Sequence, residues 1–143
     1  MKRNKFSPHA RSAARRRVLQ AVYQWQLTGL DPFKIEAQFF AEQDMDKVDG
    51  PYFKVLLHGI ALQVKFLDAA FVTFVDRDIS RLDPIELAIL RIGCYELQYC
   101  KDIPYRVVIN EAVELAKKFG ASQSHKYVNG ILDKVANTSK NLS

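Results

Sequence analysis

The 143-residue sequence has no apolar run long enough to cross a membrane, and only two cysteines, Cys94 and Cys100. A spanning helix needs about 20 consecutive apolar residues, and the charged N-terminus lacks the apolar stretch and cleavage site of a secretory signal. The cysteines are six positions apart on one predicted helix, so their side chains point about 240° apart, which excludes a mutual disulfide or a shared metal. We expect a cytoplasmic protein with two buried free thiols and no membrane association.

Histidines and glycines are too scattered to build a catalytic or cofactor site. His9, His58 and His125 lie far apart, with no spacing typical of metal ligands, and all six glycines are isolated, so there is no phosphate-binding loop. Glu111 and Glu114 are one helical turn apart, a spacing more typical of a solvated face than of a catalytic pair. The sequence also contains no nucleophile elbow or dinucleotide fingerprint. It therefore predicts no enzymatic activity, no metal and no cofactor.

Acidic residues are missing from the first 30 positions, which hold seven basic side chains. The first acid is Asp31, and residues 31–143 carry 14 basic and 16 acidic side chains, a net charge of −2 against +5 for the whole chain. A near-neutral body with a strongly basic front segment predicts a polyanionic partner, either nucleic acid or an anionic membrane surface.

Apolar residues recur with a period of 3.6, and no long stretch alternates with a period of two, so the predicted fold class is all-α. A first helix is expected from about Ser7–Pro8 to Gly29. Asp31–Pro32 starts a second, because Asp caps free amides and Pro fits the first helical position. A third and longest helix is predicted to run from Asp49–Gly50–Pro51 to about residues 76–78.

The second half of the chain predicts three further helices. Asp83–Pro84 repeats the start signal of Asp31–Pro32. The helix that follows, from Ile85 to about Tyr99, is apolar nearly all round, which is typical of a central, buried helix. Pro104 separates it from the next helix, because the residue before a proline is excluded from the α region, and Gly120 is expected to end that helix in the left-handed conformation. A last helix follows Ser122 or Ser124. We expect one compact domain, residues 1–143, of six or seven helices in two small packed bundles, about residues 8–78 and 79–137.

The first helix has features that favour RNA as the partner. Arginines at 15–17 repel one another near a helix start, where the macrodipole already disfavours cations, so an anionic partner would compensate. Arg16 and Tyr23 fall on the outward face, which pairs a phosphate-binding guanidinium with a ring on which a base can stack. A membrane fits less well because the apolar stripe is needed for the core, and duplex DNA fits less well because no recognition helix is evident.

Several strings are more specific than composition. Residues 20–27 read QAVYQWQL, 91–92 RI, 95–97 YEL, 103–105 IPY, 108–117 VINEAVELAK, 119–120 FG and 125–133 HKYVNGILD. Together they resemble the NusB family of bacterial transcription antitermination factors, from about Arg11 to Ala136. The resemblance implies two packed helical bundles and no catalytic activity. It also implies binding to the boxA element of single-stranded nascent RNA, jointly with the ribosomal protein NusE, in support of antitermination by the transcription elongation complex, notably on ribosomal RNA.

The resemblance also assigns contact residues by matching positions. Glu86 and Arg91 are weaker candidates for contact with NusE. Ser12 and Ala13 stand where family members often carry arginines, and the charge is shifted to Arg16 and Arg17, so the basic surface is expected but individual phosphate contacts are not fixed. For the aromatic candidates Phe119 and Tyr127, the alternative role is packing in the core. The RNA-contact candidates are Arg11, Arg15, Arg16, Tyr23, Phe119, Lys126 and Tyr127.

Two other interpretations stay open on the sequence. A NusB-like domain also precedes the catalytic domain of some ribosomal RNA cytosine methyltransferases, but a 143-residue chain is expected to leave no room for a cofactor-binding domain. A helical scaffold that binds only protein, for instance as a homodimer, would use its basic segment for solubility alone. Light scattering separates dimer from monomer, and an RNA-binding assay separates the scaffold from an RNA-binding protein.

Overall fold

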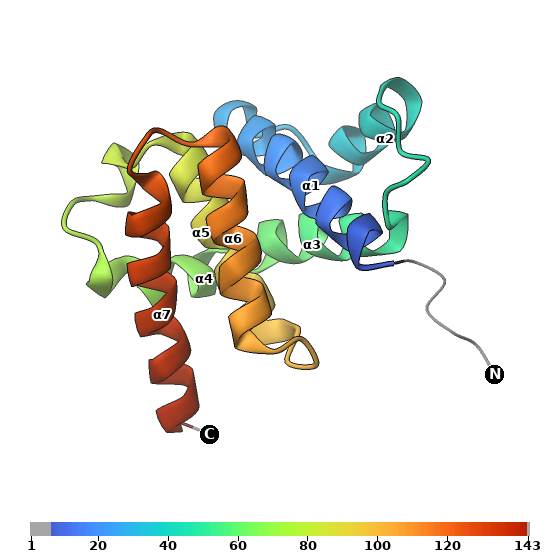
Figure 1. Cartoon of the computed structure of the whole chain (residues 1–143). Coiled ribbons are helices and arrows are strands. Elements are labelled where there is room, and N and C mark those ends of the chain that lie inside the picture. Colours follow the sequence, from blue (N-terminus) through green and yellow to red (C-terminus); the bar gives the residue numbers. More distant parts are fainter. Residues whose placement is uncertain (1–6, 143) are drawn as a thin grey trace.

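The computed structural model describes residues 7–142, and the side chains of residues 7–138. Within this range the chain is built from helices and contains no β-strand, which confirms the all-α prediction (Figure 1). The α-helices are α1 (Pro8–Thr28), α2 (Pro32–Glu42), α3 (Gly50–Leu62), α4 (Val64–Phe71), α5 (Pro84–Tyr99), α6 (Tyr105–Phe119) and α7 (Ser124–Leu142), with short 3-10 helices η1 (Val72–Phe74) and η2 (Ile79–Arg81) between α4 and α5.

Four helices begin with the same local device, a capping side chain followed by a proline in the first turn. The side chains of Ser7, Asp31, Asp49 and Asp83 accept hydrogen bonds from backbone amides at the starts of α1, α2, α3 and α5. Each such cap contributes about 1 kcal/mol. Gly29 ends α1 in the left-handed conformation, at φ 67°. The predicted starts of these four helices are confirmed.

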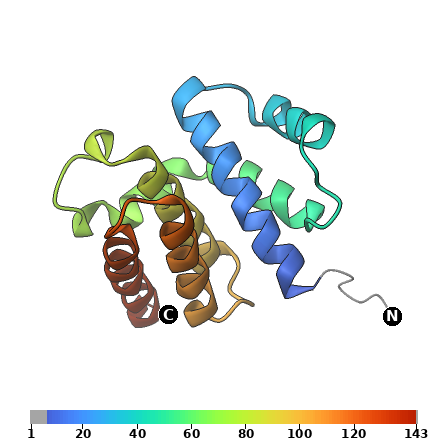
Figure 2. The same cartoon turned by 45° about the horizontal axis from the view of Figure 1, so that its top comes forward.

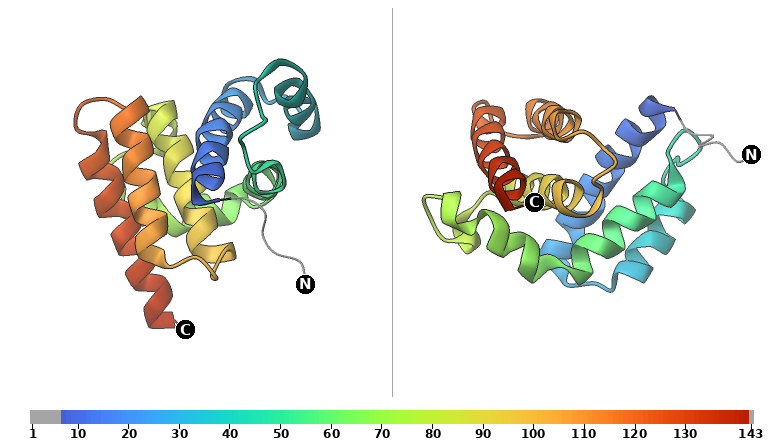
Figure 3. Two further views of the ribbon diagram at one scale, coloured as in Figure 1. Left: turned by 45° about the vertical axis from the view of Figure 1, so that its right-hand side comes forward. Right: turned by 90° about the horizontal axis from the view of Figure 1, so that it is seen from below.

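The single long helix predicted for residues 49–78 is wrong. The chain turns at Gln63 (φ −102°, ψ 16°), and α3 and the α4–η1 segment meet at 78° (Figure 3, right). Leu56 and Ile60 of α3 and Leu67 and Phe71 of α4 are all buried. Both helices pack against α5, and the bend lets their apolar faces approach it from two directions, which a straight helix could not do.

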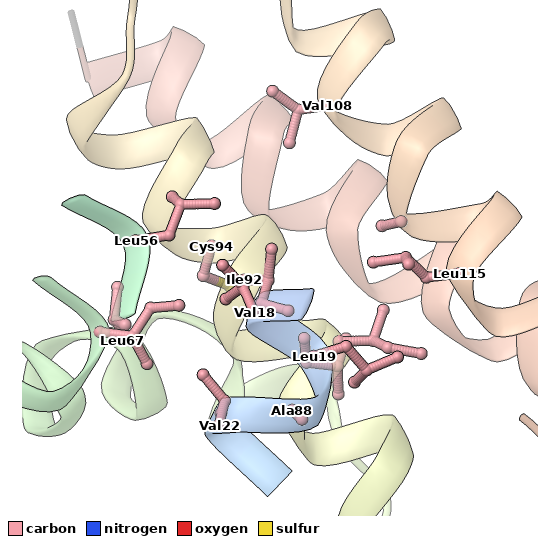
Figure 4. Packing of buried hydrophobic residues seen from close by; sticks show 14 of the residues in the cluster. Val18, Leu19, Val22, Leu56, Leu67, Ala88, Ile92, Cys94, Val108 and Leu115 are labelled. Carbon is pink, nitrogen blue, oxygen red and sulfur yellow. The ribbon is translucent and has the colours of Figure 1, made fainter. Parts of the chain in front are cut away.

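Helix α5 lies at the centre of the molecule and packs against α1, α3, α4, α6 and α7 (Figures 1 and 2). Side chains from these elements converge on it in one apolar core (Figure 4). Gly93 of α5 is required there, because a Cβ would lie 2.6 Å from Leu132 of α7. The central helix is confirmed, as are two buried free thiols at Cys94 and Cys100. The bundle boundary at residues 78 and 79 stays a prediction.

Gly120 ends α6 for a different reason from the one predicted. Its backbone is extended, at φ −91° and ψ 176°, and not left-handed. A Cβ at this position would lie 2.8 Å from the carbonyl oxygen of Ala116 and 2.9 Å from Cβ of Ser124. The glycine therefore permits the close turn from α6 into α7 by its small size, and not by its conformational freedom.

Among the described residues, no single helix combines the length and apolarity that a membrane span requires. Within this range, only α3 and the α4–η1 segment taken together are long and apolar enough, and the two are bent by 78° relative to each other.

Candidate nucleic-acid interface

Arg15 lies in a buried ionic network at the centre of the molecule. Its side chain is 5% exposed, and its Nε and Nη2 donate to both carboxylate oxygens of Glu96 on α5 at 2.8–3.0 Å. Its Nη1 donates to Glu111 of α6 at 3.0 Å, and the hydroxyl of Tyr52 on α3 also donates to Glu96. This placement argues against a phosphate contact by Arg15, because two carboxylates already occupy its guanidinium.

Arg15 keeps its positive charge in this network. Burial alone would lower the pKa of the Arg15 guanidinium, but the hydrogen bonds and charge of Glu96 outweigh burial and raise it above its ordinary value. Burial first, and then the Glu96 carboxylate, raise the pKa of Tyr52, so this residue stays a neutral donor. Arg15 thus ties α1 to α5 and α6 and fixes how the rest of α1 faces its neighbours.

Three residues of this network were not found from the sequence. Glu96 and Tyr52 were not singled out. Glu111 was predicted to lie with Glu114 on a solvated face: this is confirmed for Glu114, which is 70% exposed, but wrong for Glu111, which is only 27% exposed and accepts hydrogen bonds from Arg15 and Ser12. The available signal was an acidic residue, Glu96, inside the one helix that is apolar nearly all round, because a buried carboxylate needs a cationic partner.

Arg11 contacts two buried side chains, those of Asp49 and Tyr52. Its Nε lies 3.6 Å from a carboxylate oxygen of Asp49, and its guanidinium lies 4.3 Å from the ring centroid of Tyr52. The side chain remains 30% exposed, although its Nε is buried. Lys2, Arg3 and Lys5, the other basic residues before it, lie outside the described residues.

Arg16 and Arg17 keep their positive charge uncompensated. Arg16 is half-buried and makes no hydrogen bond or ion pair with any other side chain of residues 7–138. Among the residues that the structure describes, Arg17 donates only to neutral oxygens: the side-chain carbonyls of Gln20 and Gln43 at 3.1 Å and the backbone carbonyl of Asp44 at 3.4 Å. Both are therefore available to an anion.

Two adjoining hollows run between α1 and α6, and Arg16 and Lys118 line both of them. The first, of about 420 Å³, is called the mixed hollow because Glu111 and Glu114 line it together with basic residues. The second, of about 350 Å³, is called the basic hollow. The basic hollow is lined by Ala13, Arg16, Arg17, Gln20, Asp44, Lys47, Val48, Lys118 and Phe119.

The predicted RNA-contact residues do not all lie in one hollow. Arg16 and Phe119, which is 37% exposed, are brought together in the basic hollow. Tyr23 lies in a third hollow of about 300 Å³ between α1 and α2, which adjoins the basic hollow at Gln20. The structure thus supports a continuous surface along α1.

Lys126 and Tyr127 lie apart from these hollows, in the first turn of α7. Lys126 is exposed, whereas Tyr127 is half-buried and packs against the core. The Tyr127 hydroxyl donates to Asp76 at 3.4 Å, and the guanidinium of Arg77 lies 5.6 Å from its ring centroid. Burial, together with the charge of Asp76, raises the pKa of Tyr127.

The two candidates for a protein contact differ in what they expose. Arg91 is 9% exposed and joins three helices, donating to Asp68 of α4 at 2.8 and 2.9 Å and to Gln26 of α1 at 3.0 Å. Glu86 is half-buried and accepts a hydrogen bond from Ser124 at the start of α7. Glu86 can still offer surface to a partner, whereas Arg91 is held inside.

Within the described residues, no cluster of three or more His, Cys, Asp or Glu side chains could hold a metal ion. The mixed and basic hollows instead combine arginines, lysines and amides with three acids, Asp44, Glu111 and Glu114, beside an exposed ring. Residues 12–137 match the NusB family. The chain belongs to the NusB family.

NusB proteins of known sequence cover nearly the whole chain. The transcription antitermination protein NusB of Alcanivorax borkumensis is 56% identical over 133 residues, which are 93% of this chain and 89% of that protein. The protein of the same name from a Marinomonas species is 59% identical over 128 residues, 88% of this chain and 74% of its own.

Solved NusB structures have the same fold. NusB of T. maritima superposes with a TM-score of 0.80 at 30% identity, covering 92% of each chain. A chain in a crystal structure of the antitermination factors NusB and NusE in complex with dsRNA superposes with a TM-score of 0.84 at 26% identity, covering 92% of this chain and 99% of that one.

Proposed function

We propose that this protein is a non-catalytic RNA-binding adaptor in transcription antitermination. It binds boxA-type single-stranded RNA together with the ribosomal protein NusE, in the cytoplasm, and so supports transcription of ribosomal RNA by the elongation complex. The observation that carries the proposal is the uncompensated charge of Arg16 beside the exposed ring of Phe119. Relatives named for antitermination support the role in antitermination, and a structural neighbour crystallised with NusE and double-stranded RNA supports NusE and RNA as the classes of partner.

The side chains divide the work of binding by their chemistry. Arg16, the exposed part of Arg11 and Lys126 neutralise phosphates, which gives affinity without sequence preference. Phe119 and Tyr23 supply stacking faces, each worth about 1–3 kcal/mol per base. Tyr127 also stacks on a base, so that its ring contacts both the base and the guanidinium of Arg77.

Arg15 and Arg91 act behind this surface. Arg15 holds α1 against α5 and α6 and thereby directs Arg16 toward the hollows. Arg91 joins α1, α4 and α5, and so supports the start of α5, where Glu86 offers its carboxylate to NusE.

The test is a binding titration of this protein with boxA-type single-stranded RNA. A scrambled single strand and a duplex of the same sequence serve as controls, each with and without NusE, over a series of salt concentrations. We expect the boxA strand to bind most tightly, NusE to strengthen that binding, and log K to fall with log salt by about 0.7 per phosphate contacted. Equal, weak binding to all three RNAs with no effect of NusE would overturn the proposal.

A further inference from the structure

Cations gather in the basic hollow without matching acids. Arg16 and Arg17 come from α1, Lys47 from the segment between α2 and α3, and Lys118 from the end of α6, whereas Asp44 is the one carboxylate among the lining residues. Among the described side chains, Lys47 and Lys118 make no ion pair, as Arg16 makes none. Three separate segments thus place four positive charges around a single acid.

The fold itself does not account for this charge. A helix macrodipole favours a cation at the C-terminal end of α6, but its effect falls off within one turn and reaches neither the middle of α1 nor the segment that holds Lys47. Lys117, the neighbour of Lys118, differs because its Nζ lies 3.7 Å from a carboxylate oxygen of Glu114. Two adjacent lysines of one helix therefore differ in whether an acid already pairs with them.

The mixed hollow is a poorer site for an anion. Glu111 and Glu114 line it, so a phosphate there would meet carboxylates as well as the shared Arg16 and Lys118. In the basic hollow, an anion would meet four guanidinium and ammonium groups, the neutral amide of Gln20 and an aromatic ring, with Asp44 as the one carboxylate among the lining residues. The distribution of charge therefore favours the basic hollow, which contains Phe119, over the mixed hollow as the binding site for an RNA phosphate backbone.

We infer that the basic hollow binds the sugar–phosphate backbone of single-stranded RNA, with Arg17, Lys47 and Lys118 as phosphate contacts in addition to Arg16. This inference rests on the proposed function and extends it, because none of these three residues belongs to the RNA contacts assigned by family resemblance. Amide and carbonyl contacts hold the Arg17 guanidinium in place before RNA arrives, so less side-chain entropy is lost on binding. The strand passes between α1 and α6, with one base against Phe119.

The test compares Lys118→Gln and Lys47→Gln with Lys117→Gln as the matched control, since it removes the same charge one residue away. The full-length protein is titrated with boxA-type and scrambled single-stranded RNA over a salt series, with NusE present. Loss of one phosphate contact is expected to lower the salt slope by about 0.7 and the affinity about fivefold at 0.1 M salt. Lys118→Gln and Lys47→Gln should each show this loss, and Lys117→Gln a smaller one.

A variant that removes a negative charge, and should therefore change the affinity in the opposite direction, completes the experiment. Asp44→Asn removes the one acid of the basic hollow and keeps the side-chain oxygen that accepts from the Asp46 amide, so RNA should bind more tightly. Equal effects of Lys117→Gln and Lys118→Gln, with no gain from Asp44→Asn, would overturn the inference while boxA binding by the unaltered protein upheld the proposed function. Loss of boxA preference with the Lys118 effect intact would overturn the proposed function and keep the hollow as an RNA site.

Discussion

Arg15 and Arg16 are neighbours with the same side chain, yet they contact different parts of the molecule. The side chain of Arg15 is buried and shared between Glu96 and Glu111, whereas Arg16 lines the hollows and makes no ion pair with any described side chain. Removing one partner of a buried ion pair leaves the other charge uncompensated, which is more costly than any loss at an exposed site. One substitution at each position therefore separates stability from binding.

Arg15→Met is expected to lower the free energy of unfolding by about 3–5 kcal/mol, because it leaves the Glu96 carboxylate buried without its cation. Arg16→Gln should change it by less than about 0.5 kcal/mol, as is usual away from buried networks, but should weaken RNA binding. Urea unfolding and an RNA titration on the same preparations measure both. The double variant Arg15→Met/Glu96→Gln serves as the control and should recover most of the lost stability, since a neutral amide oxygen at position 96 can still accept from Tyr52. Equal stabilities of the two single variants would contradict this account.

Sequence reasoning found the basic segment and the outward position of Arg16, because both depend on local order and helix period. It could not find the burial of Arg15, because its partners Glu96 and Glu111 are 81 and 96 residues away in sequence. Lys47 was missed for the same reason: only the folded chain places it in the same hollow as Lys118.

Helices differ in how strongly their own sequence defines them. The starts of α1, α2, α3 and α5 were predictable because a capping side chain and a proline mark each one. The break between α3 and α4 was not, because the apolar period continues through Gln63, which is neither Gly nor Pro. Packing on α5 from two sides decides the bend.

Alanine substitutions at two helical glycines, Gly59 and Gly130, test how closely the helices pack. A Cβ at Gly59 of α3 would lie 2.3 Å from the ring of Tyr95 on α5, whereas a Cβ at Gly130 of α7 would meet nothing within 4 Å. Gly59→Ala should therefore lower the free energy of unfolding by about 1–3 kcal/mol, the usual cost of overpacking. Gly130→Ala should raise it by up to about 1 kcal/mol through helix propensity. Thermal and urea unfolding measure both, and a stabilising Gly59→Ala would show that the Tyr95 ring moves away from α3 without a net cost.

At the scale of the whole molecule, the fold concentrates charge that the sequence spreads out. The whole chain carries a net charge of +5, but cations from the first helix, the segment after α2 and the end of α6 meet around one hollow. A surface of this kind attracts and orients a polyanion before any base is read. At the bend between α3 and α4, by contrast, Leu62 and Phe66 are 79% and 69% exposed and contribute no charge.

The central claim is that RNA binds along α1 and the end of α6. The most direct test is an NMR titration of the ¹⁵N-labelled protein with boxA-type single-stranded RNA, following every backbone amide. We expect the largest chemical-shift changes at the amides of residues 11–20, 47, 118–119 and 126–127, and no change at the amides of Leu62 and Phe66. Shift changes centred on the α3–α4 bend, or none at residues 11–20, would contradict it.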